Sequence, residues 1–371
     1  MEVLSMKCSG LRLDGPLSVV MARSVMSYFK PGMMKWHYQD GLVVMGVHEV
    51  GRAYGMRELV DWAASMYDPL VMDDGTIRTY RAGEFNLDQI NAGRLLFDLY
   101  DETGARKYLL AIDRLKEQLE RQPRTLNGIF WHKEIYPWQV WLDGLYMEGP
   151  FWTRAGHFED VATQLVKVSD ILKDPSTGLY YHAWDESRGQ RWSNARTGLS
   201  PHFWSRSIGW YLMSCLDCLS YAPEGFDALK GQVSAAALDL LGSVYGFQDA
   251  GGMWYQVPDR PKARGNYLET SGSAMFCYAA LKAAAMGLTD MYVEKACKGI
   301  DGIVSRYMTQ NDGVLHLGGI CSVAGLGGNP YRNGSLKYYF KEPVVVDDFK
   351  GTGPFILACL ERERNQGCFP M

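Results

Sequence analysis

One pattern recurs six times along this chain: a polar or aromatic segment, then a glycine, then an apolar helical stretch. The glycines are Gly41, Gly93, Gly149, Gly209, Gly272 and Gly353. Their spacings of 52, 56, 60, 63 and 81 residues each leave room for one helix out, one helix back and a loop. Six helical pairs, with the more apolar helix of each pair facing inward, are typical of a closed α/α toroid. The pattern therefore predicts an all-α fold, an (α/α)6 barrel, with short β segments in its loops.

Glycine near the start of an inner helix fits this fold, because six helices converge there and a Cβ would block their approach. The alternative is an irregular helical protein whose period is accidental. Local periodicity supports helices: apolar residues at helical spacing predict amphipathic helices at 57–67, 106–119, 158–172 and 226–241. Strand-like stretches are short and lie between helices, at 178–186, 251–259 and 313–319.

No Pro- or Ser-rich linker interrupts the series, so we expect a single domain over residues 1–371. Within it, residues 1–30 would form an N-terminal lead-in and residues 360–371 a C-terminal tail. The net charge of −4 (38 basic against 42 acidic residues), without a basic run, suggests neither nucleic acid nor an anionic membrane as a partner. We expect a monomer or a weak homo-oligomer.

The eight cysteines are scattered and show no disulfide spacing. Cys215 and Cys218 form one C-x-x-C without a second pair, which is weak support for a metal or redox site. No pair of histidines has metal-ligand spacing, so neither a metal nor a cofactor is expected. The N-terminal residues lack the pattern of a secretory signal, and the chain is expected to be cytoplasmic and reduced.

Asp143 lies in the segment 131–152, which is dense in tryptophan, tyrosine and methionine. Aspartate is a poor helix former and is rarely buried without a partner, so its place beside Trp141 and Tyr146 requires an explanation. Apolar surroundings raise a carboxyl pKa, as a general acid near neutral pH requires, and aromatic faces commonly bind sugar rings. The alternative is that Asp143 caps a helix and that the aromatic residues belong to an ordinary core.

In the toroid, the polar residues just before each glycine all point to one end of the barrel. These residues are Asp40, Asp88, Asp143, Arg206, Glu269 and Asp348. They would line a common acidic pocket that contains one arginine.

At these residues the chain resembles a known family, the unsaturated rhamnogalacturonyl hydrolases of glycoside hydrolase family 105, related to the unsaturated glucuronyl hydrolases of family 88. The matching stretches are 36–41, 86–94, 132–151, 177–186, 200–211, 252–259, 266–281, 321–335 and 338–355. They cover nearly the whole chain. The family's fold is an (α/α)6 barrel, which agrees with the six glycine-centred units.

The resemblance implies a glycoside hydrolase that acts on an oligosaccharide with a Δ4,5-unsaturated uronic acid at its non-reducing end. Such ends are left by polysaccharide lyases, and galacturonic acid linked to rhamnose, from the rhamnogalacturonan of pectin, is the expected form. The residue corresponding to Asp143 protonates C4 of the enol ether and activates the water that adds at C5. The resulting hemiketal opens and expels the leaving sugar. One carboxyl thus acts first as an acid and then as a base.

The resemblance also assigns roles to other residues. Asp88 would be the second catalytic candidate, holding a sugar hydroxyl or influencing the protonation of Asp143; the alternative is a helix cap. His182 and Arg206 would contact the uronate, since a guanidinium can bind both carboxylate oxygens. Trp210 would stack on the sugar, or belong to the core.

The remaining substrate-binding candidates lie in the same matching stretches and would meet the leaving sugar or line the pocket. They are Asp40, Gly41, His132, Lys133, Tyr136, Met147 and Trp204. For Lys133 a solvated loop position is the alternative. The glycine-rich segment 325–334 lacks the strand, helix and lysine of a P-loop and is expected to be a loop at the pocket rim.

Three other functions stay open at this point. The same chemistry could act on unsaturated glucuronyl ends, a choice that sequence predicts poorly. A non-catalytic sugar-binding protein could use the same barrel, although Asp143, Asp88, His182 and Arg206 are all intact. An epimerase would require paired catalytic histidines, and the sequence shows no such pair.

Overall fold

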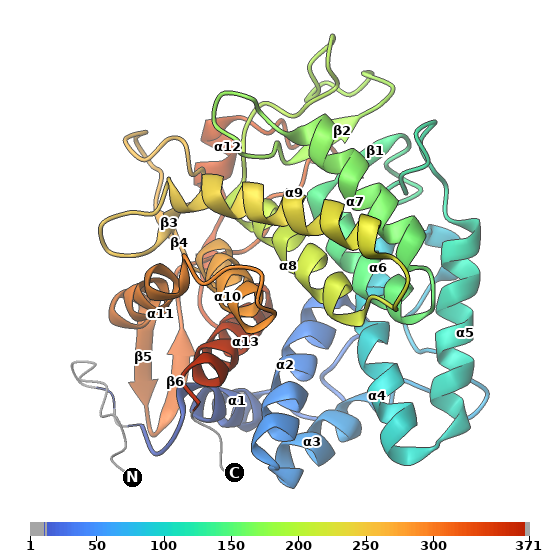
Figure 1. Cartoon of the computed structure of the whole chain (residues 1–371). Coiled ribbons are helices and arrows are strands. Elements are labelled where there is room, and N and C mark those ends of the chain that lie inside the picture. The colour runs from blue at the N-terminus through green and yellow to red at the C-terminus, as the bar shows by residue number, and fades with distance from the viewer. Residues whose placement is uncertain (1–10, 12, 368–371) are drawn as a thin grey trace.

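The computed structural model describes residues 11 and 13–367 and shows two concentric rings of helices (Figure 1). The inner helices are α2 (Tyr38–Tyr54), α4 (Arg94–Thr103), α6 (Leu142–Arg154), α8 (Ser205–Tyr221), α10 (Thr270–Ala285) and α13 (Phe349–Asn365). The outer helices are α1 (Leu17–Tyr28), α3 (Arg57–Tyr67), α5 (Arg106–Arg121), α7 (Phe158–Leu172), α9 (Asp227–Tyr245) and α11 (Val293–Tyr307). Each inner helix packs against its neighbours around the ring, and α13 closes it on α2. The predicted all-α (α/α)6 barrel is confirmed.

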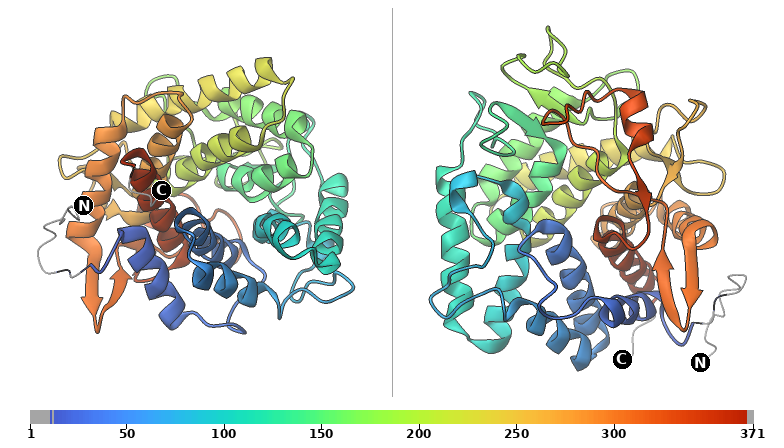
Figure 2. Two further views of the ribbon diagram at one scale, coloured as in Figure 1. Left: turned by 60° about the horizontal axis from the view of Figure 1, so that its bottom comes forward. Right: turned by 180° about the vertical axis from the view of Figure 1, so that it is seen from behind.

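The left view of Figure 2 looks into the ring, with its colours following chain order around the circle. The four outer helices expected from apolar periodicity correspond to α3, α5, α7 and α9. One α-helix of the described part belongs to neither ring: α12 (Leu336–Lys341) lies in the loop before α13. Three short 3-10 segments, 82–84, 87–89 and 91–93, precede α4. None of the helices in this part of the chain is long and apolar enough to cross a membrane.

The repeated glycines lie where inner helices approach one another most closely. A Cβ on Gly209 of α8 would lie 2.6 Å from the Cβ of Met275 on α10. A Cβ on Gly353 of α13 would lie 2.8 Å from Cγ of Leu42 on α2. Neither distance is compatible with a side chain, since packed interiors leave no space for an added methyl group. The steric reason proposed for the repeated glycines is confirmed at these helix contacts.

Four antiparallel pairs of short strands occupy loops, as expected. They are β1 (Gln139–Trp141) with β2 (Ala183–Asp185), β3 (Trp254–Tyr255) with β4 (Leu268–Glu269), β5 (Met308–Asn311) with β6 (Val314–Leu317), and β7 (Ile320–Cys321) with β8 (Val344–Val345). β1 leads directly into α6, β4 into α10, and β8 ends shortly before α13. These pairs therefore fix the starting points of three inner helices.

The expected terminal boundaries differ from the structure. α1, inside the expected lead-in, is an outer helix that packs on α13 and completes the ring. Residues 360–365, inside the expected tail, form the last turns of α13, where Leu360 is fully buried. The carboxylate of Glu363 accepts a hydrogen bond of 3.0 Å from the backbone N–H of Ser18. α1 and the last turns of α13 are thus parts of the barrel, because a closed ring needs a partner for its last inner helix.

The six cysteines of the described part are free thiols. Cys215 and Cys218 are free and fully buried in α8, where they pack as small apolar side chains. Cys8 and Cys368 lie outside the described residues.

Pro150 interrupts the backbone hydrogen bonding of α6, the helix that carries Asp143. Proline has no N–H, so the carbonyl of Tyr146, four residues earlier, lacks its helical donor. Asn91 supplies a replacement, because its side-chain N–H donates to that carbonyl at 2.8 Å. Both groups are buried in the ring. Asn91 thereby links the segment that carries Asp88 to the helix that carries Asp143.

Asn91→Ala is expected to lower the free energy of unfolding by about 1–3 kcal/mol, because the carbonyl of Tyr146 would stay buried without a donor. Urea denaturation of the variant and the wild type measures this difference. Gln232→Ala, on the exposed face of α9, serves as the control and should change the free energy of unfolding by less than about 0.5 kcal/mol. Equal stability of Asn91→Ala and wild type would contradict this role of Asn91.

Candidate active site

Five of the six inner helices begin at the same end of the barrel and bring the expected polar residues together there. Asp143 is the second residue of α6 and Arg206 the second residue of α8, while Asp348 caps α13. Tyr38, the first residue of α2, marks where they converge. Burial raises the pKa of Tyr38, the charges of Asp88, Asp143 and Asp348 raise it further, and Arg206 opposes them.

Asp143 faces His182 across the start of α6. Its Oδ2 lies 3.4 Å from Nε2 of His182, and within the described part of the chain neither atom has a hydrogen-bond partner. His182 is fully buried, and its Nδ1 is 2.8 Å from the hydroxyl of Tyr339. The N-cap of α6 is Trp141, so Asp143 does not cap the helix. Its side chain is 15% exposed, although Oδ2 itself is buried.

Asp88 occupies a different environment. Its Oδ2 lies 2.6 Å from Nζ of Lys133 and 4.0 Å from Nε2 of His37, and its Oδ1 lies 3.4 Å from Nε2 of His132. Burial alone would raise the pKa of Asp88, but Lys133, His132 and His37 together hold it well below its ordinary value. Asn86, and not Asp88, accepts the capping hydrogen bond of this segment. Asp88 is therefore a fixed anion, and Lys133 is its partner and not a solvated loop residue.

His132 belongs to a stack of rings beside the two carboxylates. Its ring lies 4.7 Å from that of Trp141 with an interplanar angle of 11°, and Tyr136 stacks on Trp141 at 5.0 Å and 17°. The hydroxyl of Tyr136 accepts a hydrogen bond of 3.0 Å from Arg332, which lies in the glycine-rich segment 325–334. The stack joins that segment to His132.

Burial lowers the pKa of His132 to about 4, while the charge of Asp88 acts in the opposite direction. The folded protein therefore binds a proton at His132 less readily than the unfolded chain, whose histidine has a pKa of 6.5. We expect the free energy of unfolding to fall as the pH drops from about 6.5 towards 4. Denaturation at several pH values should show a shallower decline in His132→Gln. The same slope in both proteins would contradict this assignment.

Arg206 is buried among neutral acceptors. Its guanidinium donates to the carbonyl of Cys321 at 2.6 Å and to the hydroxyl of Ser271 at 3.3 Å. It also lies 4.6 Å from the ring centre of Trp204. Bonds from Arg206 thus connect the start of α8 to the start of α10 and to β7.

The expected acidic pocket with one arginine is wrong in two respects. Lysines also enter the site: Lys133 pairs with Asp88, and Nζ of Lys350 lies 2.8 Å from Oδ2 of Asp348. Glu269 is fully buried, and its carboxylate accepts bonds from Ser271, Gly272 and Cys321, so it does not face a ligand. Lys133 lies outside the positions just before each glycine, whereas Lys350 stands three residues before Gly353 and was overlooked.

Three expected substrate-binding residues lie beneath the site. Trp210 is 1% exposed, with its ring 4.9 Å from that of Tyr146 and 5.9 Å from that of Tyr38. Met147 is also 1% exposed. A Cβ on Gly41 would lie 2.7 Å from Cα of Ala92. In this structure these residues support the residues above them and present little surface to a ligand.

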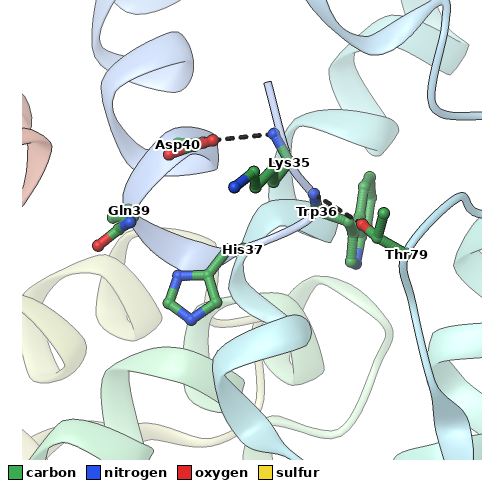
Figure 3. Close-up of a pocket in the computed structure, with 6 residues that line it drawn as sticks. All are labelled: Lys35, Trp36, His37, Gln39, Asp40 and Thr79. Carbon is green, nitrogen blue, oxygen red and sulfur yellow. Dashed lines mark hydrogen bonds between the residues drawn. The ribbon is translucent and has the colours of Figure 1, made fainter. Parts of the chain in front are cut away.

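A cavity of about 280 Å³ adjoins the site (Figure 3). Its lining residues are Lys35, Trp36, His37, Gln39, Asp40 and Thr79. Asp40 accepts a hydrogen bond of 2.9 Å from the backbone N–H of Lys35, and burial raises the pKa of Asp40. His37 connects this cavity to Asp88. Asp40, expected to contact the leaving sugar, thus lines the same cavity as His37, whose Nε2 is 4.0 Å from Oδ2 of Asp88.

Sequence reasoning missed Tyr38, His37, Tyr339 and Lys350 as parts of the site. All four lie inside matched stretches, 36–41 and 338–355, and could have been chosen from them. Tyr339 is 157 residues from its partner His182, a separation that no local pattern predicts. Among the described residues, no group of three or more His, Cys, Asp or Glu side chains could hold a metal ion.

The sequence is similar to known glycoside hydrolases. The family model described as Glycosyl Hydrolase Family 88 matches residues 18–366. The chain is 29% identical over 293 residues to the unsaturated rhamnogalacturonyl hydrolase YesR of Bacillus subtilis (strain 168), which covers 73% of this chain and 78% of the relative.

Solved structures show the same barrel. A glycoside hydrolase from family 105 of C. acetobutylicum superposes with a TM-score of 0.91 and 38% identity, covering 94% of this chain and all of that one. An unsaturated glucuronyl hydrolase from Bacillus sp. GL1 has a TM-score of 0.66 at 14% identity, covering 94% and 95% of the two chains. The second likeness concerns the fold alone.

Proposed function

The chain belongs to glycosyl hydrolase family 88 and its relatives of family 105, and from this premise we propose that it releases Δ4,5-unsaturated galacturonic acid from rhamnogalacturonan oligosaccharides. The observation that carries the proposal is the inequality of its two central carboxylates. Lys133 holds Asp88 as an anion, whereas Oδ2 of Asp143 lacks a hydrogen-bond partner among the described residues. Ordinary glycosidases need two working carboxyls at the anomeric carbon. Hydration of a double bond needs one.

In the proposed reaction, Asp143 transfers its proton to C4 of the enol ether and leaves positive charge on C5 and the ring oxygen. Asp143, now a carboxylate, removes a proton from the water that adds at C5. The hemiketal formed at C5 then opens, and the leaving sugar departs from C1. His182 would hold Asp143 in place, since Tyr339 fixes the opposite side of its imidazole ring.

The charge distribution suits a substrate that carries a carboxylate. Positive ends of the inner helix dipoles meet at the site, because α2, α6, α8, α10 and α13 all begin there. Arg206, Lys133 and Lys350 add formal positive charge. An ionised uronate would be stabilised by this field. Arg206 is buried, with its guanidinium bonded to Cys321 and Ser271, and would act through its charge.

The cavity beside Asp88 would receive the leaving sugar. Its lining offers a hydroxyl from Thr79, an amide from Gln39 and the carboxylate of Asp40, groups that can exchange hydrogen bonds with a neutral sugar. Galacturonyl-rhamnose is the proposed substrate because the chain is similar to the relative from Bacillus subtilis named for that activity. A cytoplasmic location belongs to the same proposal, as Cys215, Cys218, Cys277, Cys297, Cys321 and Cys359 are free thiols.

A panel of lyase-generated unsaturated disaccharides tests the substrate. We expect the highest kcat/KM with unsaturated galacturonyl-rhamnose, measured by the loss of ultraviolet absorbance of the conjugated double bond. A clear preference for an unsaturated glucuronyl disaccharide would overturn the galacturonyl assignment and leave the chemistry intact. Turnover of none of them would overturn the hydrolase itself.

A further inference from the structure

Three exposed apolar side chains lie in the loop segment before β1. Leu126 is 87% exposed, Ile135 71% and Trp138 37%. All three lie within 13 residues, on the segment that also carries His132 and Lys133.

Trp138 is held in an unfavourable backbone conformation. Its φ of 63° lies in the left-handed region, which is unusual for a bulky residue and persists only where surrounding contacts impose it. The carbonyl of Trp138 accepts a bond of 3.0 Å from the backbone N–H of Glu186, whose carboxylate accepts one of 2.8 Å from the N–H of Leu126. These bonds hold the backbone of Trp138 at a positive φ, which glycine would adopt with less strain.

A second tryptophan adjoins the first. The rings of Trp131 and Trp138 are 4.8 Å apart and tilted by 57°. The backbone N–H of His132 bonds the carbonyl of Gln139 at 3.0 Å, so these two residues close the base of the loop 132–139. The tryptophans immediately precede the two residues of that base. Trp131 is therefore followed directly in the chain by His132 and Lys133, which lie 3.4 Å and 2.6 Å from the carboxylate oxygens of Asp88.

We propose that Leu126, Trp131, Ile135 and Trp138 form a distal platform for sugar units beyond the scissile bond. The occupant is the continuation of the substrate chain, because the platform begins where the pocket residues end and offers aromatic faces to the apolar faces of pyranose rings. The inference rests on the proposed function. It makes the enzyme selective for unsaturated oligosaccharides longer than a disaccharide.

Kinetics on two chain lengths test the platform. The probes are the unsaturated disaccharide and the unsaturated tetrasaccharide prepared from rhamnogalacturonan with a lyase. We expect wild type to favour the tetrasaccharide, and Trp138→Gly to lower the ratio of the two kcat/KM values roughly three- to tenfold, mainly through the KM for the tetrasaccharide. Glycine accepts the positive φ without strain, so the backbone is expected to keep its path. Trp138→Phe retains a ring and should restore most of the ratio.

Met291→Ala is the matched control, since Met291 is 73% exposed beyond the far ends of the inner helices, and its ratio should equal that of wild type. If Trp138→Gly keeps the wild-type ratio of the two kcat/KM values, the platform is refuted. Turnover of the disaccharide would still support the proposed function in that case. An equal loss of ratio in Met291→Ala would overturn the platform as well. Absence of turnover on both substrates by wild type would instead refute the proposed function on which the platform depends.

Discussion

Replacing Asp143 with asparagine is expected to lower kcat on unsaturated galacturonyl-rhamnose by roughly 10³-fold or more, since an amide can neither donate the proton to C4 nor accept one from water. The two side chains have nearly the same size, and Oδ2 of Asp143 has no hydrogen-bond partner in the described structure. The fold should therefore remain intact. Initial rates from ultraviolet absorbance measure the loss, and thermal unfolding checks the fold.

Asp113→Asn is the matched control, because Asp113 is an exposed residue of the outer helix α5. Its kcat should equal that of wild type. A turnover of Asp143→Asn within about tenfold of wild type would show that another group protonates the substrate. His182 and Asp88, the groups nearest to the site's centre, would then need to be reconsidered.

The largest effect on stability is expected at Asp217, which lies between Cys215 and Cys218 in α8. Its carboxylate accepts bonds from Arg94 at 2.7 Å, Lys282 at 2.8 Å and Tyr278 at 2.6 Å. Asp217→Ala would leave two cations in the barrel interior without their counter-ion. We expect the free energy of unfolding to fall by about 3–5 kcal/mol.

Chemical denaturation of Asp217→Ala and of Asp170→Ala, an exposed position on α7, measures this loss. Burial would raise the pKa of Asp217, but Lys282 and Arg94 lower it to about 2, below the ordinary value of 3.8. The contribution of Asp217 is therefore present above about pH 4 and is lost as the pH falls towards 2. A loss below about 1 kcal/mol, equal to that of the surface control, would contradict the role of this cluster.

The Asp217 cluster also supports the active site from below. Arg94 donates a hydrogen bond of 2.6 Å to the hydroxyl of Tyr146. Tyr146 stacks on Trp210, and Trp210 packs edge-on against Tyr38, at the point where the site residues converge. Charges in the middle of the barrel thus hold the aromatic residues that underlie the site.

The ring itself could be predicted from the sequence, because close helix contacts impose a local rule. At Gly209 and Gly353 a neighbouring inner helix leaves no room for a Cβ, and the glycines that recur along the chain indicate the number of units. Asp88, Asp143 and Arg206 could be found for the same reason, since they occupy nearby positions at the starts of successive units.

Other features depend on contacts between segments that are far apart in the sequence. Asn91 compensates for Pro150 only because α6 packs beside the segment before α4. The burial of Glu269 and of Trp210 depends on loops and helices that the repeat does not describe. Lys133 was open to two interpretations until its distance to Asp88 decided between them.

The most direct test of the central claim follows the double bond and the leaving sugar in one reaction. Wild-type enzyme is incubated with unsaturated galacturonyl-rhamnose, and the ultraviolet absorbance and the free rhamnose are measured over time. If the double bond is hydrated, one double bond should be lost for each rhamnose released. The loss of absorbance should also precede or accompany the release of rhamnose. Rhamnose released while the absorbance persists would contradict the claim, because the leaving sugar would then depart by direct attack at the anomeric carbon.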